Sequence, residues 1–182
     1  MNIPEMYDYL VRTRRDLWTA LEGVPDEVLN AALLKGESFH SIKDLAFHIP
    51  STEDGWLHWT ILQDEPVQRT MPGLKDIGNG PLKTEFTLET LLEYWRAVEK
   101  STVAYLEGLT PTELNRIVED SPKEHFKLEG LLWHVMIHEM RHTAQICVLL
   151  RTQGIKPPSL DLLFYLPQAQ PLSSGNSSER KF

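Results

Sequence analysis

The longest stretch with apolar residues at helical spacing, residues 128–153, contains the sequence His138-Glu139-Met140-Arg141-His142. Two histidines four residues apart lie on the same face of a helix, one turn from each other, so both imidazoles can point at one divalent metal ion. The motif constrains the fold because a metal ion needs a third ligand from another segment. A zinc protease and a helical bundle would supply that ligand from different directions.

The rest of the chain also favours helices. Apolar residues recur at helical spacing in three further segments, and loops rich in Pro and Gly separate them. The predicted helices are residues 6–21, 41–62, 88–109 and 128–153, and residues 116–126 are predicted to be a turn or a short hairpin. We therefore predict an all-α fold, a four-helix bundle with long inter-helix loops over residues 1–168. Residues 169–182 are predicted to be a disordered tail.

The second helix carries both a start signal and an interruption. Ser41 and Asp44 have the spacing of a capping box, with Asp in place of the usual Glu. Pro50 removes one backbone hydrogen bond, which predicts either a kink or a break with a restart at Ser51. The loop that follows, residues 64–85, is long enough to suggest a functional role, and we expect it to cover one mouth of the bundle.

Charge and composition exclude several classes of protein. The net charge is −8 and no run of Lys or Arg is present, which argues against binding to nucleic acid or to an anionic membrane. No segment approaches the roughly 20 apolar residues of a membrane span. The single Cys147 cannot form an intramolecular disulfide, and no signal segment opens the chain, so we expect a cytoplasmic protein.

Spacing within the helices predicts which histidines face the core. Steps of four and three connect Leu131, Val135, His138, His142, Gln145 and Leu149 in the last helix, and Leu45, His48, Thr52, Gly55, Trp59 and Leu62 in the second. His48, His138 and His142 should therefore point inward. Three imidazoles are the number of protein ligands that a catalytic metal site uses, with a fourth position left open.

Other interpretations apply to single histidines. An inward-facing histidine taken alone is more often a hydrogen-bonded core residue than a ligand. The pair His138 and His142 favours metal, because two stacked imidazoles without a shared partner leave donors and acceptors unsatisfied. His134 lies off the core-facing stripe, and we expect it to hydrogen-bond or to support a ligand. Surface or packing roles are expected for His40, His58 and His125.

Three segments together resemble a known family. They are SIKDLAFHI at residues 41–49 with Trp56 following, the HxxxHxxxHxxQIxxLLR pattern at residues 134–151, and PPSLDLLFYL at residues 157–166. Over residues 3–166 the chain resembles the DinB-like (YfiT-type) superfamily of metal-dependent enzymes. The resemblance implies a divalent metal held by one histidine of the second helix and two of the fourth, which correspond to His48, His138 and His142.

The resemblance also implies an activity and an assembly. Family members with known activity use the metal to activate a low-molecular-weight thiol for transfer or isomerisation, and the family forms homodimers. This chain has His142-Thr143-Ala144-Gln145 where the family often has His-Arg-Gly-Gln, a difference that keeps the ligands and alters the surrounding pocket. The resemblance thus implies a small-molecule substrate, but not which one.

The chemistry of the residues supports a thiol transferase or a hydrolase. Three neutral imidazoles leave the charge of a divalent ion uncompensated, so a bound water or thiol would lose its proton near neutral pH. Zinc or nickel suits such a site best, and iron or manganese also fits. Glu139 is predicted to act as a base or to orient an imidazole, with exposure to solvent as the alternative, and Gln145 to hydrogen-bond the substrate or the ligands.

Two alternatives from other classes remain. In an H-E-x-x-H zinc metalloprotease the third ligand would come from downstream, with Asp161 as the candidate, but such an enzyme needs a sheet edge to bind its peptide substrate. In a non-catalytic, stress-related bundle the metal would be structural, although structural zinc sites are usually closed and rich in cysteine.

Overall fold

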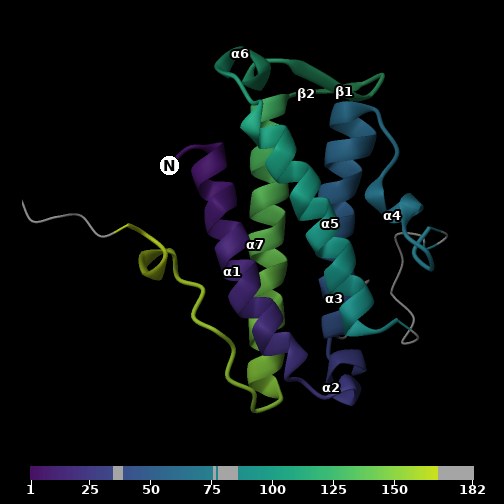
Figure 1. Cartoon of the computed structure of the whole chain (residues 1–182), viewed down its shortest axis with the longest axis vertical. Coiled ribbons are helices and arrows are strands. Elements are labelled where there is room, and N and C mark those ends of the chain that lie inside the picture. The colour runs from purple at the N-terminus through teal and green to yellow at the C-terminus, as the bar shows by residue number, and fades with distance from the viewer. Residues whose placement is uncertain (35–38, 76, 78–85, 168–182) are drawn as a thin grey trace, which may run out of the picture.

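The computed structural model describes residues 1–34, 39–75, 77 and 86–167, and its long helices form a four-helix bundle (Figure 1). The long segments are α1 (Ile3–Glu22), α3 (Ile42–Asp54) continued by the π-helix η1 (Gly55–Leu62), α5 (Leu88–Glu107) and α7 (Leu128–Thr152). The short elements are α2 (Asp26–Asn30), α4 (Val67–Thr70), α6 (Pro111–Leu114), β1 (Ile117–Ser121), β2 (Glu124–Lys127) and η2 (Leu162–Phe164). Residues 169–182, predicted to be a tail, lie outside the described residues. So do residues 76 and 78–85 of the predicted loop 64–85.

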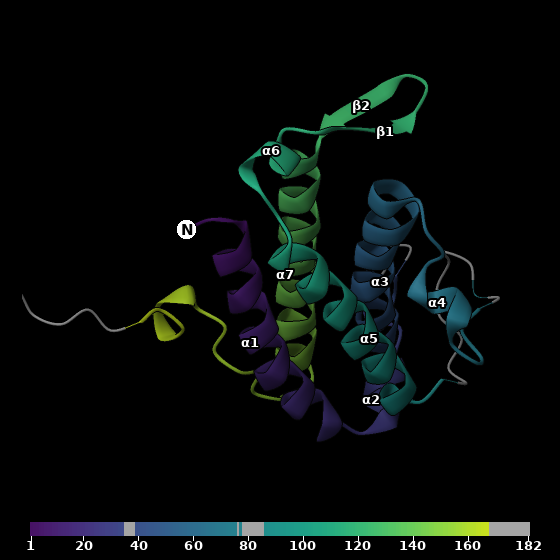
Figure 2. The same ribbon diagram turned by 45° about the horizontal axis from the view of Figure 1, so that its top comes forward.

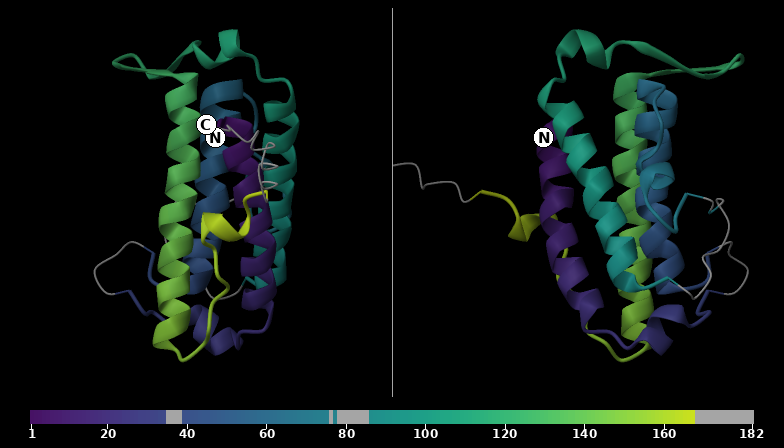
Figure 3. Two further views of the ribbon diagram at one scale, coloured as in Figure 1. Left: turned by 90° about the vertical axis from the view of Figure 1, so that its left-hand side faces the viewer. Right: turned by 45° about the vertical axis from the view of Figure 1, so that its right-hand side comes forward.

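The long helices pack so that each has two main neighbours. Both α1 and α3 pack against α5 and α7, which places α1 and α3 at opposite corners of the bundle. The hairpin of β1 and β2 crosses one end of the bundle, and α2 lies at the other end (Figure 2). The yellow segment after α7 turns back and passes along α1 (Figure 3). No helix in the described part of the chain is long and apolar enough to cross a membrane.

Capping residues set where the first helices begin. The capping box of Ser41 and Asp44 is formed as predicted, with the Ser41 hydroxyl accepting from the Asp44 N–H and the Asp44 carboxylate accepting from the Ser41 N–H. Helix α1 begins three residues before the prediction because Asn2 and Glu5 form a second capping box. This signal was present in the sequence.

The second helix does not break at Pro50, and the predicted restart at Ser51 is wrong. Helix α3 continues through Pro50, which is buried. Packing on α5 and α7 outweighs the single missing backbone hydrogen bond. The irregularity comes at Gly55, where the backbone changes to a π-helix that ends at Gln63 in the left-handed region (φ 54°).

Residues 116–126, after α6, were predicted to be a turn or a short hairpin, and they form a hairpin. Strands β1 and β2 pair antiparallel, with Ile117 opposite Lys127 and Val118 opposite Phe126.

Only part of the C-terminal apolar segment packs on the bundle. Tyr165 lies edge-on to Tyr9 of α1, with 5.5 Å between the ring centroids. Phe164 in the same segment is 68% exposed. Helices α2 and α4 are too short to give a periodic pattern, and they were not predicted.

Two of the three apolar clusters in the core have a charged layer between them. One of the two is at the α2 end and the other at the hairpin end, and the third joins α3 and α5 to Leu74 after α4. Each long helix contributes a buried charged residue between the first two clusters: Arg14 on α1, Glu53 on α3, Glu99 on α5 and Glu139 on α7. The histidines singled out by the sequence flank this layer.

Candidate metal centre

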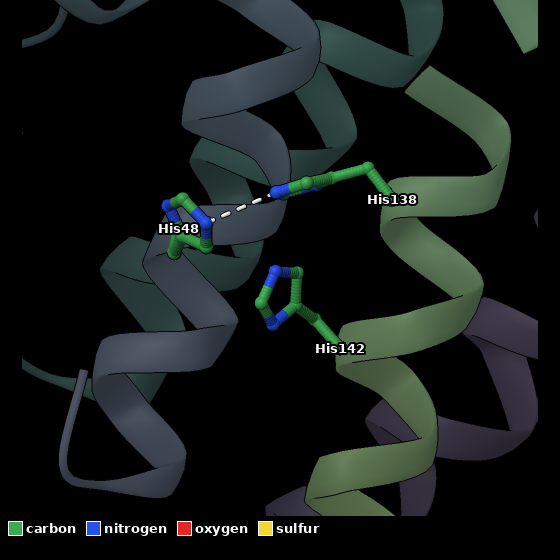
Figure 4. Close-up of side chains that lie close together, drawn as sticks. All are labelled: His48, His138 and His142. Atoms are coloured by element: carbon green, nitrogen blue, oxygen red, sulfur yellow. Dashed lines mark hydrogen bonds between the residues drawn. The ribbon is translucent and has the colours of Figure 1, made fainter. Parts of the chain in front are cut away.

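The structure brings His48, His138 and His142 together between α3 and α7 (Figure 4). Their ring centroids are 4.3 to 4.8 Å apart, and one nitrogen from each ring lies within 4.8 Å of the others. The Nε2 atoms of His48 and His138 are 3.1 Å apart. The one histidine of the second helix and the two of the last helix that were predicted as ligands thus lie together, and their binding of a metal stays a prediction.

Burial keeps two of these imidazoles, His48 and His138, neutral. It lowers the pKa of His48 to about 4, with a further contribution from the nearby His142. Burial, His142 and His48 together lower the pKa of His138 to about 3. A neutral imidazole offers one nitrogen lone pair to a metal, so at pH 7 His48 and His138 present unprotonated donors.

Gln145 and Phe39 hold two of the rings. The Gln145 Oε1 atom is 2.6 Å from His142 Nδ1 and accepts its proton. This hydrogen bond leaves the lone pair on His142 Nε2, the tautomer that a ligand at Nε2 requires. The ring of Phe39 stacks on His48 with 3.8 Å between centroids. Gln145 thus contacts one of the three predicted ligands, His142.

Glu139 faces away from the histidines. Its carboxylate is 3% exposed and accepts two hydrogen bonds from Arg14, at 2.6 Å from Nε and 2.5 Å from Nη2. The exposed alternative for Glu139 is wrong, because α7 buries this position against α1. Its contacts favour a role in holding the helices together over the predicted role as a base.

The other histidines and Asp161 lie elsewhere. His134 is exposed and contacts Trp56 edge-on, with 5.4 Å between centroids. His58 is buried, with Nδ1 2.7 Å from the Asp54 carboxylate, so it has the packing role that was one of its predicted alternatives. Asp161 caps η2 through the Leu163 N–H. Among the described residues, the three histidines are the one group of possible ligands gathered within bonding reach of a single ion.

A pocket of about 830 Å³ adjoins the cluster and shares His48 with it. Trp56, Trp59, Arg69 and Lys75 are among its lining residues. Trp59 is 59% exposed, and the Arg69 guanidinium lies over its ring at 5.0 Å. The described residues give neither Arg69 nor Lys75 an ion-pair partner, and the Asp120 carboxylate, which also lines the pocket, accepts a hydrogen bond from Thr60. The pocket therefore combines aromatic surface with two cations and one carboxylate.

Sequence reasoning missed Arg14, although its position carried a signal. Leu10, Arg14, Leu17 and Leu21 follow the same steps of four and three as the core positions of the other helices. Arg14 therefore occupies a core position, where a charge has to find partners. Those partners, Glu53, Glu99 and Glu139, come from three other helices, and spacing within one helix cannot identify them.

Comparisons with known proteins agree with this architecture. The model of the DinB family matches residues 1–173. A DinB-like protein from Bacillus cereus is 22% identical, with a TM-score of 0.58 over 85% of this chain and 94% of that chain. YfiT from Bacillus subtilis, described as "a probable metal-dependent hydrolase with an unusual four-helix bundle topology", is 18% identical, with a TM-score of 0.60 over 85% and 89%. At these identities the likeness bears on the fold alone. No curated protein matches the chain.

Proposed function

The chain belongs to the DinB family, and from this premise we propose that it is a metal-dependent enzyme acting on a small molecule. His48, His138 and His142 would hold one divalent ion, and the substrate would bind in the adjoining pocket. The observation that carries the proposal is the approach of three imidazole nitrogens to within 4.8 Å, beside a pocket that shares His48. Among the described residues this group has three members, and a three-ligand site leaves a coordination position for water or substrate.

The donor set fits a divalent ion on chemical grounds. Nitrogens of two neutral imidazoles 3.1 Å apart repel each other unless a proton or a cation lies between them. Imidazole suits zinc and nickel best, and iron or manganese is also compatible. When bound, such an ion supplies a Lewis acid that lowers the pKa of a water or thiol ligand.

Neighbouring side chains orient two of the three imidazoles and form the walls of the pocket. Gln145 holds the His142 ring in the tautomer that presents Nε2, and Phe39 covers one face of His48. Trp59 and Arg69 give the pocket one apolar and one cationic surface, which suits a substrate with an aromatic or aliphatic part and an anionic group.

Hydrolysis is the reaction class that we favour. A three-imidazole site with an open position is the arrangement that activates water, and the similar YfiT is described as "a probable metal-dependent hydrolase". Transfer of a low-molecular-weight thiol uses the same site and stays a prediction, as do the homodimer and the cytoplasmic location. The protease alternative loses support, because Asp161 caps η2 and the two described strands form a hairpin at one end of the bundle.

The test is metal stoichiometry in protein purified without a histidine tag. Wild type dialysed against zinc or nickel should hold one ion per chain, and His48→Ala should hold none, because two imidazoles from one helix bind a divalent ion far more weakly than three. His125→Ala is the matched control, since His125 is 50% exposed on β2. A wild-type chain that holds no metal, or a His48→Ala variant that holds one ion at unchanged affinity, would refute the proposed site.

A further inference from the structure

Arg14 is a buried cation that contacts all three other long helices. It lies at mid-length of α1 and is 1% exposed. Its guanidinium donates to Glu139 on α7 through Nε and Nη2, to Glu53 on α3 through Nη2 at 2.9 Å, and to Glu99 on α5 through Nη1 at 3.1 Å. One side chain therefore joins four helices at a single level of the bundle.

The partners of Arg14 are themselves fixed. Glu53 is 2% exposed and also accepts hydrogen bonds from the hydroxyls of Tyr7 and Thr102. Glu99 also pairs with Arg15, which is 49% exposed. A planar guanidinium has a rigid fork of donors, so these bonds form in few relative positions of the helices, whereas apolar contacts tolerate small slides.

The same two helices carry the histidines. Glu139 directly follows His138 and precedes His142 by three residues, and Glu53 lies five residues after His48. A single atom, Arg14 Nη2, donates hydrogen bonds to both the Glu53 and the Glu139 carboxylates and so bridges them. A slide of α3 along α7 by one residue, about 1.5 Å, would break this bridge and also separate His48 from the other two imidazoles.

We propose that Arg14 is a positioning residue of the metal site: by bridging Glu53 and Glu139 it fixes α3 against α7 at the spacing that three ligands of one ion require. The proposal rests on the proposed metal-binding function. It assigns Arg14 no contact with metal or substrate. It also explains why a charged layer, rather than apolar side chains, fills this level of the core.

The experiment compares cobalt binding by folded variants. Arg14→Lys keeps the charge and loses the fork, and it should still bind one Co²⁺ per chain, with affinity at least about fivefold lower and an altered visible absorption spectrum. Arg15→Lys is the matched control, because Arg15 makes the neighbouring contact to Glu99 and none to α3 or α7, and it should leave both properties unchanged.

A second variant covers the case in which Arg14→Lys does not fold. Glu139→Gln keeps the side-chain shape and one acceptor while removing the charge that Arg14 holds, and it should weaken Co²⁺ binding in the same direction. A merely structural role would lower the melting temperature and leave the cobalt spectrum and affinity of the folded protein as in wild type, which would overturn the proposal. A wild type without metal would instead refute the proposed function.

Discussion

Asp54 offers the sharpest test of how the pocket wall is held. Its carboxylate is completely buried at the end of α3 and is surrounded by four donor groups. The backbone N–H groups of Val67 and Gln68, both at 2.9 Å, and the Tyr94 hydroxyl at 2.8 Å donate hydrogen bonds to it, and His58 Nδ1 lies 2.7 Å from it. Asp54 thus fixes the first turn of α4 and, through it, the side of the pocket that contains Gln68 and Arg69.

The substitution Asp54→Asn keeps the volume and changes the hydrogen bonding. The amide oxygen of Asn can accept hydrogen bonds from the donors that face one carboxylate oxygen of Asp54. The amide NH₂ group would replace the other oxygen, and the two donors that face it would lose their acceptor. Each buried unsatisfied donor costs about 1–3 kcal/mol, so the expected loss is about 2–5 kcal/mol of unfolding free energy. For a chain of this size that corresponds to a fall in melting temperature of about 5–15 °C.

The assay is thermal and urea unfolding followed by circular dichroism. Tyr94→Phe is the control, because it removes one of the four donors and should cost only about 1 kcal/mol. The double variant should cost less than the sum of the two, since Tyr94 and Asp54 contact each other. If Asp54→Asn destabilises the protein no more than Tyr94→Phe, the four-donor account of this carboxylate is wrong.

The pH dependence gives an independent check. The hydrogen bond with Asp54 raises the pKa of His58, although burial acts in the opposite direction. The charged imidazole is thus favoured in the folded protein, and its stabilising contribution is complete below the unfolded pKa of about 6.5 and is lost as the pH rises through the raised pKa. Wild type should lose stability over this range, and Asp54→Asn should not show the loss.

Two further predictions concern the histidine cluster. Gln145→Leu should weaken zinc binding by about 10-fold in a chelator competition, because His142 loses the acceptor that selects its tautomer, while Gln153→Leu at the exposed end of α7 should have no effect. In EDTA the metal-free protein should lose stability as the pH falls from about 6.5 toward 4. Burial lowers the pKa of His48 to about 4 and that of His138 to about 3 in the folded protein, so the unfolded chain binds these protons at a higher pH and is favoured over this range. A melting temperature that stays constant over that range, or a loss equally large in a variant with both histidines replaced by Phe, would contradict this account.

Much of the site followed from spacing alone. A helix repeats every 3.6 residues, so steps of four and three selected His48, His138 and His142, which the structure brings together. The same steps were wrong for Trp59 and Leu62, which are 59% and 41% exposed, because they lie in the π-helix η1, where the backbone does not keep this repeat. The capping box at Ser41 fixed the start of the second helix for the same local reason. Of the kink and the break that were the two alternatives at Pro50, the break did not occur, because packing of α3 against its neighbours outweighs the loss of one backbone hydrogen bond.

The role of Glu139 shows where such reasoning stops. On its own helix it lies beside two predicted ligands, which suggested a base or an exposed carboxylate. Its partner is Arg14, which lies 125 residues earlier in the chain, and no local pattern connects the two.

The sequence by itself thus determined the four long helices, the inward faces of their regular α-helical parts and the choice of the three histidines, because these depend on the geometry of a single helix and on side-chain chemistry. Only the tertiary structure decided what each inward polar group meets: His48 with His138, Asp54 with the first turn of α4, and Arg14 with three carboxylates. The physical reason is that a buried polar group must find its partner across the core, and the packing of one helix against another decides which group that is.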